Sequence, residues 1–256
     1  MDFKSEYEIK KEIIEIGRRC WIKGWVASND GNISVKLSEN EILTTVTGVS
    51  KGFLTMDMIV KVDMDGNLIE GKRKPSSELP MHLMVYKVRK DAGAVLHTHP
   101  PYATGFAVSG VSLEDCILPE IILSMGAIPL TPYGTPSTDE VPNSIKPYIE
   151  KHEGVLMKNH GALTIGKNLL EAYYRMESLE HAAKIIFISR ELGGVSLLGE
   201  EEVKKLMEVR KKYNIPEDKP MCKITKDNKK DVDDKLVEEV VKRVSEKLKE
   251  LSGGDK

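Results

Sequence analysis

The sequence contains few cysteines and no pattern that pairs them. Its 256 residues include Cys20, Cys116 and Cys222, and no Cys-x-x-Cys occurs. An odd number of widely spaced cysteines argues against a disulfide framework and favours a reducing compartment. We therefore expect three free thiols that are buried or incidental to function.

The sequence also lacks an excess of one charge and a long apolar run. Its 38 basic and 40 acidic residues leave a formal net charge of −2, which points neither to nucleic acid nor to disorder. No apolar run approaches the roughly 20 residues that span a bilayer, and the polar first residues predict no signal peptide. The length suffices for one large domain with a sizeable core. We expect a cytoplasmic protein that binds neither nucleic acid nor membranes.

Three of the six histidines follow short apolar segments. Residues 92–96 predict a buried strand, and His97 and His99 come directly after it. Side chains two residues apart on an extended chain point to the same side, so these two imidazoles should lie together. His160 follows a second predicted strand, residues 154–157. The pattern predicts a metal site built from three imidazoles.

Three protein imidazoles with an open position are typical of a catalytic zinc site, although other first-row metals also accept imidazole. We expect Glu78 beside the ion, at the start of a helix predicted over residues 79–90. The other histidines, His82, His152 and His181, are interpreted as ordinary side chains. His82 is also a weak reserve ligand, because it lies one helical turn after Glu78.

Polar residues at segment ends suggest an anion site. Ser76 and Ser77 fit ordinary helix capping, but free amides and hydroxyls at a helix start also form a seat for phosphate. Asn32, Thr47 and Gly48 fit ordinary turn chemistry, and they too can offer amides and hydroxyls to an anion. The residues alone leave both interpretations open.

Periodicity predicts the other elements. A helix over residues 5–26 begins at a capping box formed by Ser5 and Glu8. Further strands are predicted at 33–37, 41–47, 59–63 and 128–132, and further helices at 101–109, 119–125, 138–151, 168–192 and 201–213. The short strands suggest an antiparallel or mixed sheet.

Five motifs occur in the order and spacing of one family. They are Gly31-Asn32-Ile33-Ser34, Thr47-Gly48, Pro75-Ser76-Ser77-Glu78, His97-Thr98-His99 and Asn159-His160-Gly161. From about residue 5 to 215 the chain resembles the class II aldolase and adducin family, and within it the fuculose-phosphate aldolases. The resemblance implies that residues 1–216 form an α/β/α sandwich with a mostly antiparallel central sheet. It also implies a homotetramer with active sites at subunit interfaces.

The resemblance implies a role for each matching residue. One zinc ion per subunit would be bound by His97, His99 and His160, with Glu78 as a further ligand and as the acid/base. The substrate phosphate would be held by Asn32, Thr47, Gly48, Ser76 and Ser77. Tyr213 resembles a tyrosine that a neighbouring subunit contributes to protonate the leaving aldehyde. The family's second tyrosine is missing from the corresponding stretch, residues 117–122, where this chain has Glu120 instead.

The implied reaction is metal-dependent cleavage of L-fuculose 1-phosphate, or a close ketose 1-phosphate, to dihydroxyacetone phosphate and L-lactaldehyde. The metal would act as a Lewis acid, and Glu78 would move a proton. The family's sugar-phosphate 4-epimerases, dehydratases and decarboxylases use overlapping parts, and the missing tyrosine leaves the choice open. A non-enzymatic, adducin-like binding module is the alternative from another class, and the intact histidines and Glu78 argue against it.

The last residues have a different composition. Residues 217–231 are charged and poor in apolar side chains, which predicts a linker. Residues 232–251 carry an apolar stripe at helical spacing, which predicts an amphipathic helix. This helix either packs on the enzyme or a neighbouring subunit, or docks to a shell protein, because it resembles the encapsulation peptides of bacterial microcompartments.

Overall fold

The computed structural model describes residues 4–212, 220–224 and 241–247. The chain divides into two compact units, Met1–Lys223 and Ile224–Lys256. In the second unit, residues 241–247 form a helix on which Val241 and Val244 are exposed. The rest of the predicted amphipathic helix lies outside the described residues.

The first unit is built on one eight-stranded sheet in the order β4-β3-β2-β1-β5-β8-β7-β6. The strands are β1 (Asn32–Lys36), β2 (Glu41–Thr45), β3 (Ile59–Asp63), β4 (Leu68–Glu70), β5 (Ala94–Thr98), β6 (Leu130–Thr131), β7 (Gly154–Met157) and β8 (Gly161–Gly166). All neighbours pair antiparallel except β6 and β7, which are parallel. The prediction of a mostly antiparallel sheet is confirmed.

Helices cover both faces of this sheet. They are α1 (Glu6–Ile22), α2 (Leu79–Val88), α3 (Pro101–Val108), α4 (Pro119–Ser124), α5 (Glu140–Ile149), α6 (Leu169–Glu191) and α7 (Glu200–Lys212), with short 3-10 turns η1 (Lys51–Phe53) and η2 (Met56–Met58). Helix α1 begins at the predicted capping box, in which the Ser5 and Glu8 side chains each accept a hydrogen bond from the other's backbone N–H. The box satisfies two of the amides that a helix start leaves unpaired.

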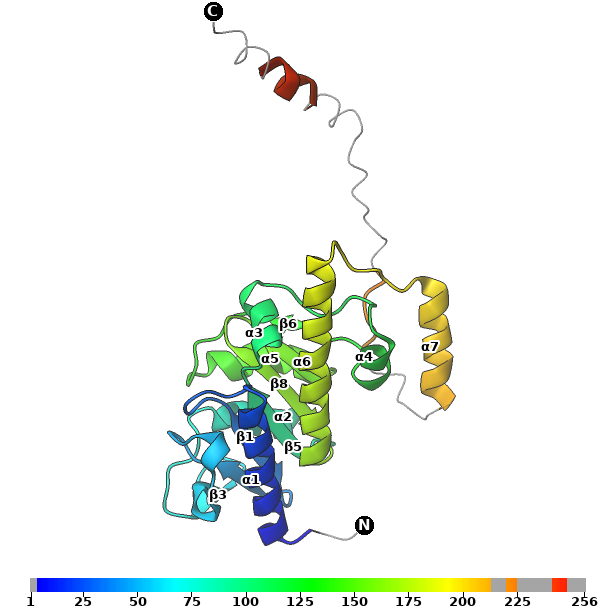
Figure 1. The fold of residues 1–256 in the computed structure, drawn as a ribbon. Helices are drawn as coiled ribbons and strands as arrows, with labels where there is room; N and C mark the ends of the chain where they lie inside the picture. The colour runs from blue at the N-terminus through cyan, green and yellow to red at the C-terminus, as the bar shows by residue number, and fades with distance from the viewer. Residues whose placement is uncertain (1–3, 213–219, 225–240, 248–256) are drawn as a thin grey trace, which may run out of the picture. The chain divides into compact units, whose positions relative to one another are not determined.

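The sheet separates two apolar cores, and β5 contributes to both. Ala94 and Leu96 pack into the core beneath α1, α3 and α6, whereas Val95 packs into the core beneath α2 and α5. Figure 1 shows α1 and α6 lying side by side over the sheet. Successive side chains of a strand point to opposite faces, so a strand buried on both faces feeds both layers. This is the predicted α/β/α sandwich.

The expectation of three free thiols is wrong. Cys116 and Cys222 form a disulfide that joins positions 106 residues apart, while Cys20 is free and buried. The disulfide lies in a third small core between α4 and α7, which includes Ile122 and Val203. An odd count leaves at least one thiol unpaired but does not prevent two others from pairing.

Residues 220–223 fall in the predicted linker but belong to the first unit. The Lys223 N–H donates to the Glu114 carbonyl, and its ammonium lies 3.0 Å from the Glu114 carboxylate. The Pro220 carbonyl approaches so closely that a Cβ on Gly126 would lie 2.0 Å from it. No helix in the described part of the chain is long and apolar enough to cross a bilayer.

Candidate metal centre and active site

Most of the predicted site residues that the structure describes gather at one end of the sheet. Asn32 begins β1 and pairs directly with His97, near the end of β5. His160 lies in the turn between β7 and β8, and the β8 strand that follows pairs with β5 as well. Sheet register therefore brings three distant stretches of sequence to one place.

Two special backbone positions permit this convergence. Asn159 has a φ of 57°, a left-handed conformation that asparagine tolerates better than most residues. At Gly161 an added Cβ would lie 2.6 Å from Cδ2 of His99 and 2.7 Å from the Thr98 carbonyl oxygen. The motif Asn159-His160-Gly161 thus turns the chain and lets β8 approach the two histidines of β5.

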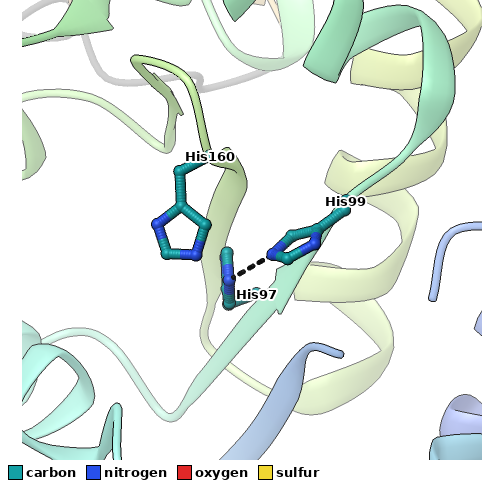
Figure 2. Close-up of side chains that lie close together, drawn as sticks. All are labelled: His97, His99 and His160. Carbon is teal, nitrogen blue, oxygen red and sulfur yellow. Dashed lines mark hydrogen bonds between the residues drawn. The ribbon is translucent and has the colours of Figure 1, made fainter. Parts of the chain in front are cut away.

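The three histidines face one another (Figure 2). The Nε2 atoms of His97 and His99 are 3.1 Å apart, and the centroids of the three rings are separated by 4.8–5.1 Å. One ligand atom from each residue can be chosen so that all three lie within 4.8 Å of one another. Zinc–nitrogen bonds of about 2.0–2.1 Å at tetrahedral angles place two ligating nitrogens about 3.3 Å apart.

Neighbouring acceptors indicate which nitrogen of His97 and of His99 carries the proton. Nδ1 of His97 lies 2.9 Å from the Ala162 carbonyl, which can only accept, so the proton is on Nδ1 and the lone pair on Nε2. Nδ1 of His99 faces the Asp30 carboxylate at 3.5 Å in the same way. Two lone pairs that meet across 3.1 Å repel each other unless a cation lies between them. The donor set therefore fits a divalent metal, with carbonyl and carboxylate partners orienting the rings.

Glu78 is the N-cap residue of α2, and its carboxylate points at the histidine group. Its Oε1 lies 3.3 Å from Nε2 of His160, and its Oε2 lies 3.5 Å from Nε2 of His97. Oε2 also accepts a hydrogen bond of 2.8 Å from the Asn32 amide. Oε1 is buried without a hydrogen-bond partner among the described residues, as expected of an atom that faces a ligand or a metal.

The protonation states suit metal binding. Burial lowers the pKa of His97 to about 3 and also lowers the pKa of His99, so both rings are neutral, the form that ligates a metal. Burial alone would raise the pKa of Glu78, but the facing imidazoles and the Asn32 amide hold that pKa well below its ordinary value. The amide donor favours an ionised carboxylate whatever the charge on the rings.

Four of the residues predicted to hold phosphate lie on two loop segments whose backbones bond to each other. The Thr47 N–H donates to the Lys74 carbonyl, and the Ser76 N–H donates to the Thr45 carbonyl. Thr47 and Gly48 are exposed, and Gly48 has a φ of 70°. Ser77 is exposed and lies next to Glu78, whereas the Ser76 hydroxyl accepts from the Glu78 N–H. The structure thus brings four of the five residues together.

Asn32, the fifth residue, is engaged elsewhere. It is 3% exposed, and both ends of its amide bond to other side chains, Glu78 and His82. His82 is fully buried and turned toward Asn32 and Ser34, so in the structure it is not part of the histidine group. The reserve-ligand hypothesis for His82 has no support from this arrangement.

Other predicted residues lie apart from the histidine group or outside the described chain. Tyr213 is outside the described residues, and Glu120 is exposed on α4. His152 donates from Nδ1 to the Ala127 carbonyl, and His181 lines a cavity of about 520 Å³ beside Trp25 that contains none of the three histidines. The two latter histidines therefore lie outside the histidine group.

Two residues near the site were not anticipated from the sequence. Asp30 faces His99, and Lys51 is 3% exposed beneath the same loop. The Lys51 ammonium donates to the carbonyls of Asn29 and Val49 at 2.8 Å each. Burial lowers the pKa of Lys51 to about 8. Its bonds tie the loop before β1 to the loop that carries Thr47 and Gly48.

The fold and site define a class of protein: an α/β/α sandwich with a three-histidine group that fits a divalent metal at one end of its sheet. Residues 11–187 match the model of the class II aldolase and adducin N-terminal domain. The chain therefore belongs to that family.

Relatives of two activities resemble the chain to a similar degree. The L-fuculose phosphate aldolase of Methanococcus maripaludis is 36% identical over 181 residues, which cover 71% of this chain and 97% of that protein. The 3-oxo-tetronate 4-phosphate decarboxylase of Pectobacterium atrosepticum is 31% identical over 188 residues, which cover 72% and 86%. A solved structure of L-fuculose 1-phosphate aldolase superposes with a TM-score of 0.74 at 30% identity, covering 82% of this chain and all of that one. Family membership does not decide between these activities.

Proposed function

We propose that this protein is a zinc-dependent lyase that cleaves L-fuculose 1-phosphate, or a close ketose 1-phosphate, to dihydroxyacetone phosphate and L-lactaldehyde. The observation that carries the proposal is the pairing of three convergent imidazoles with a carboxylate 3.3 and 3.5 Å from two of them. The histidines would hold the metal, and Glu78 would work at its edge.

The chemistry requires one proton to move. Cleavage of the bond between carbons 3 and 4 leaves an electron pair on carbon 3 beside the ketone and turns the carbon-4 hydroxyl into an aldehyde. Zinc, when bound, supplies Lewis-acid stabilisation of that negative charge. Glu78 is ionised at rest, so it can take up the hydroxyl proton and return it to carbon 3 as general base and then acid. Tyr213 would orient the aldehyde part.

The phosphate would be bound away from the reacting bond. Thr47, Gly48 and Ser77 offer exposed hydroxyls and amides there, and Ser76 lies beside them. Binding energy from a remote phosphate orients the carbon chain and contributes to catalysis without touching the reacting atoms. Asn32 contributes indirectly, because its amide already bonds to Glu78.

Decarboxylation of a 3-oxo-tetronate 4-phosphate is the second candidate. Loss of CO₂ from a 3-oxo acid leaves an electron pair on carbon 2 beside a ketone, and its protonation again gives dihydroxyacetone phosphate. The same metal would serve, and Glu78, which is ionised at rest, would relay to carbon 2 a proton that comes from water. The missing tyrosine in residues 117–122 favours this candidate, since loss of CO₂ needs no proton transfer at the oxygen of an aldehyde product.

The test is a coupled assay for dihydroxyacetone phosphate with each substrate separately. Zinc-loaded protein is expected to release it from L-fuculose 1-phosphate together with one equivalent of aldehyde, and a chelator is expected to abolish release. Release from the 3-oxo acid alone, with CO₂, would replace the aldolase by the decarboxylase. Release from neither substrate by protein with one zinc per chain would contradict both.

The proposal includes a homotetramer whose neighbouring subunits complete each site. Helix α6 supports it, because Phe187, Ile188 and Leu192 are exposed apolar side chains within two turns at its C-terminal end. Large apolar side chains grouped on a surface often mark contacts between chains. Light scattering is expected to give the mass of four chains. A monomer with full activity would refute the shared site.

The C-terminal helix is proposed to dock to a microcompartment shell protein. Its support is the exposure of Val241 and Val244 within the described helical residues. Deletion of residues 225–256, which spares the disulfide, is expected to leave activity intact and to abolish co-localisation with shell protein. Loss of the tetramer instead would show that the helix packs between subunits.

A further inference from the structure

A chain of buried polar side chains runs from Glu78 into the core beneath α2. Asn32 bonds to the Glu78 carboxylate at 2.8 Å and to Nε2 of His82 at 2.5 Å. Nδ1 of His82 lies 2.6 Å from the Ser34 hydroxyl, which lies 2.8 Å from the Tyr86 hydroxyl. None of these residues except Glu78 is more than 3% exposed.

The periodicity of two elements brings this network together. Asn32 and Ser34 are two residues apart on β1 and share the face opposite Ile33. His82 and Tyr86 are four residues apart on α2 and share one face of the helix. The polar face of the strand therefore meets the polar face of the helix at the sheet end that carries the histidine group.

The chemistry of the groups fixes the direction of every hydrogen bond. A carboxylate only accepts, so the Asn32 amide presents its N–H to Glu78 and its oxygen to His82. Nε2 of His82 must then donate, which leaves a lone pair on Nδ1 that accepts from the Ser34 hydroxyl. That hydroxyl accepts in turn from Tyr86. Rotation of any member would set two donors or two acceptors against each other.

We propose that His82 is a positioning residue that acts on Glu78 through Asn32. The His82 Nε2–H donates to the Asn32 amide oxygen and so fixes one orientation of that amide. The amide N–H then donates to Oε2 of Glu78, which leaves Oε1 free toward His160. The inference rests on the proposed function only in that Glu78 is taken as the acid/base.

A purely structural role does not account for the arrangement. A buried imidazole paired with a neighbouring carbonyl would stabilise the fold equally well. Here the His82 N–H donates to the oxygen of the Asn32 amide, and the N–H of the same amide donates to the Glu78 carboxylate. Glu78 has one oxygen held and the other without a hydrogen-bond partner among the described residues, so the network selects the oxygen that meets substrate.

The kinetic test compares three variants. His82→Leu removes the donor, and His82→Gln keeps an amide N–H near the position of Nε2. His152→Leu is the matched control, because His152 bonds to a backbone carbonyl outside the network. We expect His82→Leu to lower kcat by about 10- to 100-fold with little change in KM. His82→Gln should recover most of the wild-type kcat, and His152→Leu should have the wild-type kcat. A wild-type kcat in His82→Leu, or a loss equal to that of His152→Leu, would overturn the proposal.

A second measurement needs no turnover. Histidine-labelled protein is expected to show the neutral Nε2–H tautomer at the resonance that His82→Gln removes, and the Asn32 side-chain amide is expected to exchange slowly in wild type and faster in His82→Leu. An Nδ1–H tautomer, or unchanged amide exchange, would refute the network even if the protein turned over neither test substrate. Failure of both substrates with the expected spectra would instead refute only the proposed function.

Discussion

The disulfide between Cys116 and Cys222 closes a loop of 106 residues, and its removal should have a large effect on stability. Opening a loop of that length restores about 5 kcal/mol of conformational entropy to the unfolded chain at 25 °C. A change of 1 kcal/mol shifts the midpoint by roughly 2–4 °C in a protein of this size. The midpoint of thermal unfolding should therefore fall by about 10–20 °C. This is an upper bound, because detachment of the small core between α4 and α7 would release only part of the chain.

The assay is calorimetry with and without reductant. The unfolding midpoint of wild type should fall on reduction. The double variant Cys116→Ala/Cys222→Ala should have a low midpoint that reductant does not change. Cys20→Ala is the control, since Cys20 is a free buried thiol. Thiol titration of unreduced, denatured wild type should find one reactive thiol per chain. Three thiols, or a midpoint that reductant does not move, would refute the reasoning.

Three further predictions concern the site. Glu78→Gln should retain one zinc per chain and lose most turnover, because an amide cannot take up a proton; steady-state rates with metal analysis check it, and full turnover of loaded variant would contradict it. Gly161→Ala should weaken zinc binding on the order of tenfold or more in calorimetric titration, since its Cβ would lie 2.6 Å from His99, whereas Gly105→Ala, which meets nothing within 4 Å, should not. Burial lowers the pKa of His82 to about 4 from 6.5, so the unfolded chain takes up a proton first as pH falls. The free energy of unfolding, measured by denaturant titration, should fall by about 3 kcal/mol as the pH is lowered from 6.5 to 4. The fall should be smaller in His82→Gln.

Local periodicity was sufficient to predict much of the site. His97 and His99 are two residues apart in an extended segment, so their shared direction follows from strand geometry alone. The position of His160 followed from its place after an apolar run. Strand β8 (Gly161–Gly166) was not predicted, although Asn159 and Gly161 turn the chain between it and the strand before it.

The contacts that could not be predicted join residues far apart in the sequence. The His82 to Ser34 contact spans 48 residues, and the disulfide spans 106. A local signal for the first did exist: Asn32 and Ser34 are polar positions that alternate with Ile33 and Val35 in a buried strand. Buried polar groups need partners, and His82 and Tyr86 occur at helical spacing on the next helix. Nothing local identifies the partner of Cys116.

The histidine group and the phosphate candidates occupy one end of the strands, and this leaves the other end available for engineering. Turn residues 38–40, between β1 and β2, are exposed and lie at the far end of β1 from Asn32. Five extended residues separate them from the chemistry by about 16 Å. An affinity tag, a fluorophore or an immobilisation peptide inserted in that turn should leave turnover unchanged. The protein could then be attached to a surface through residues 38–40 with its active site facing away.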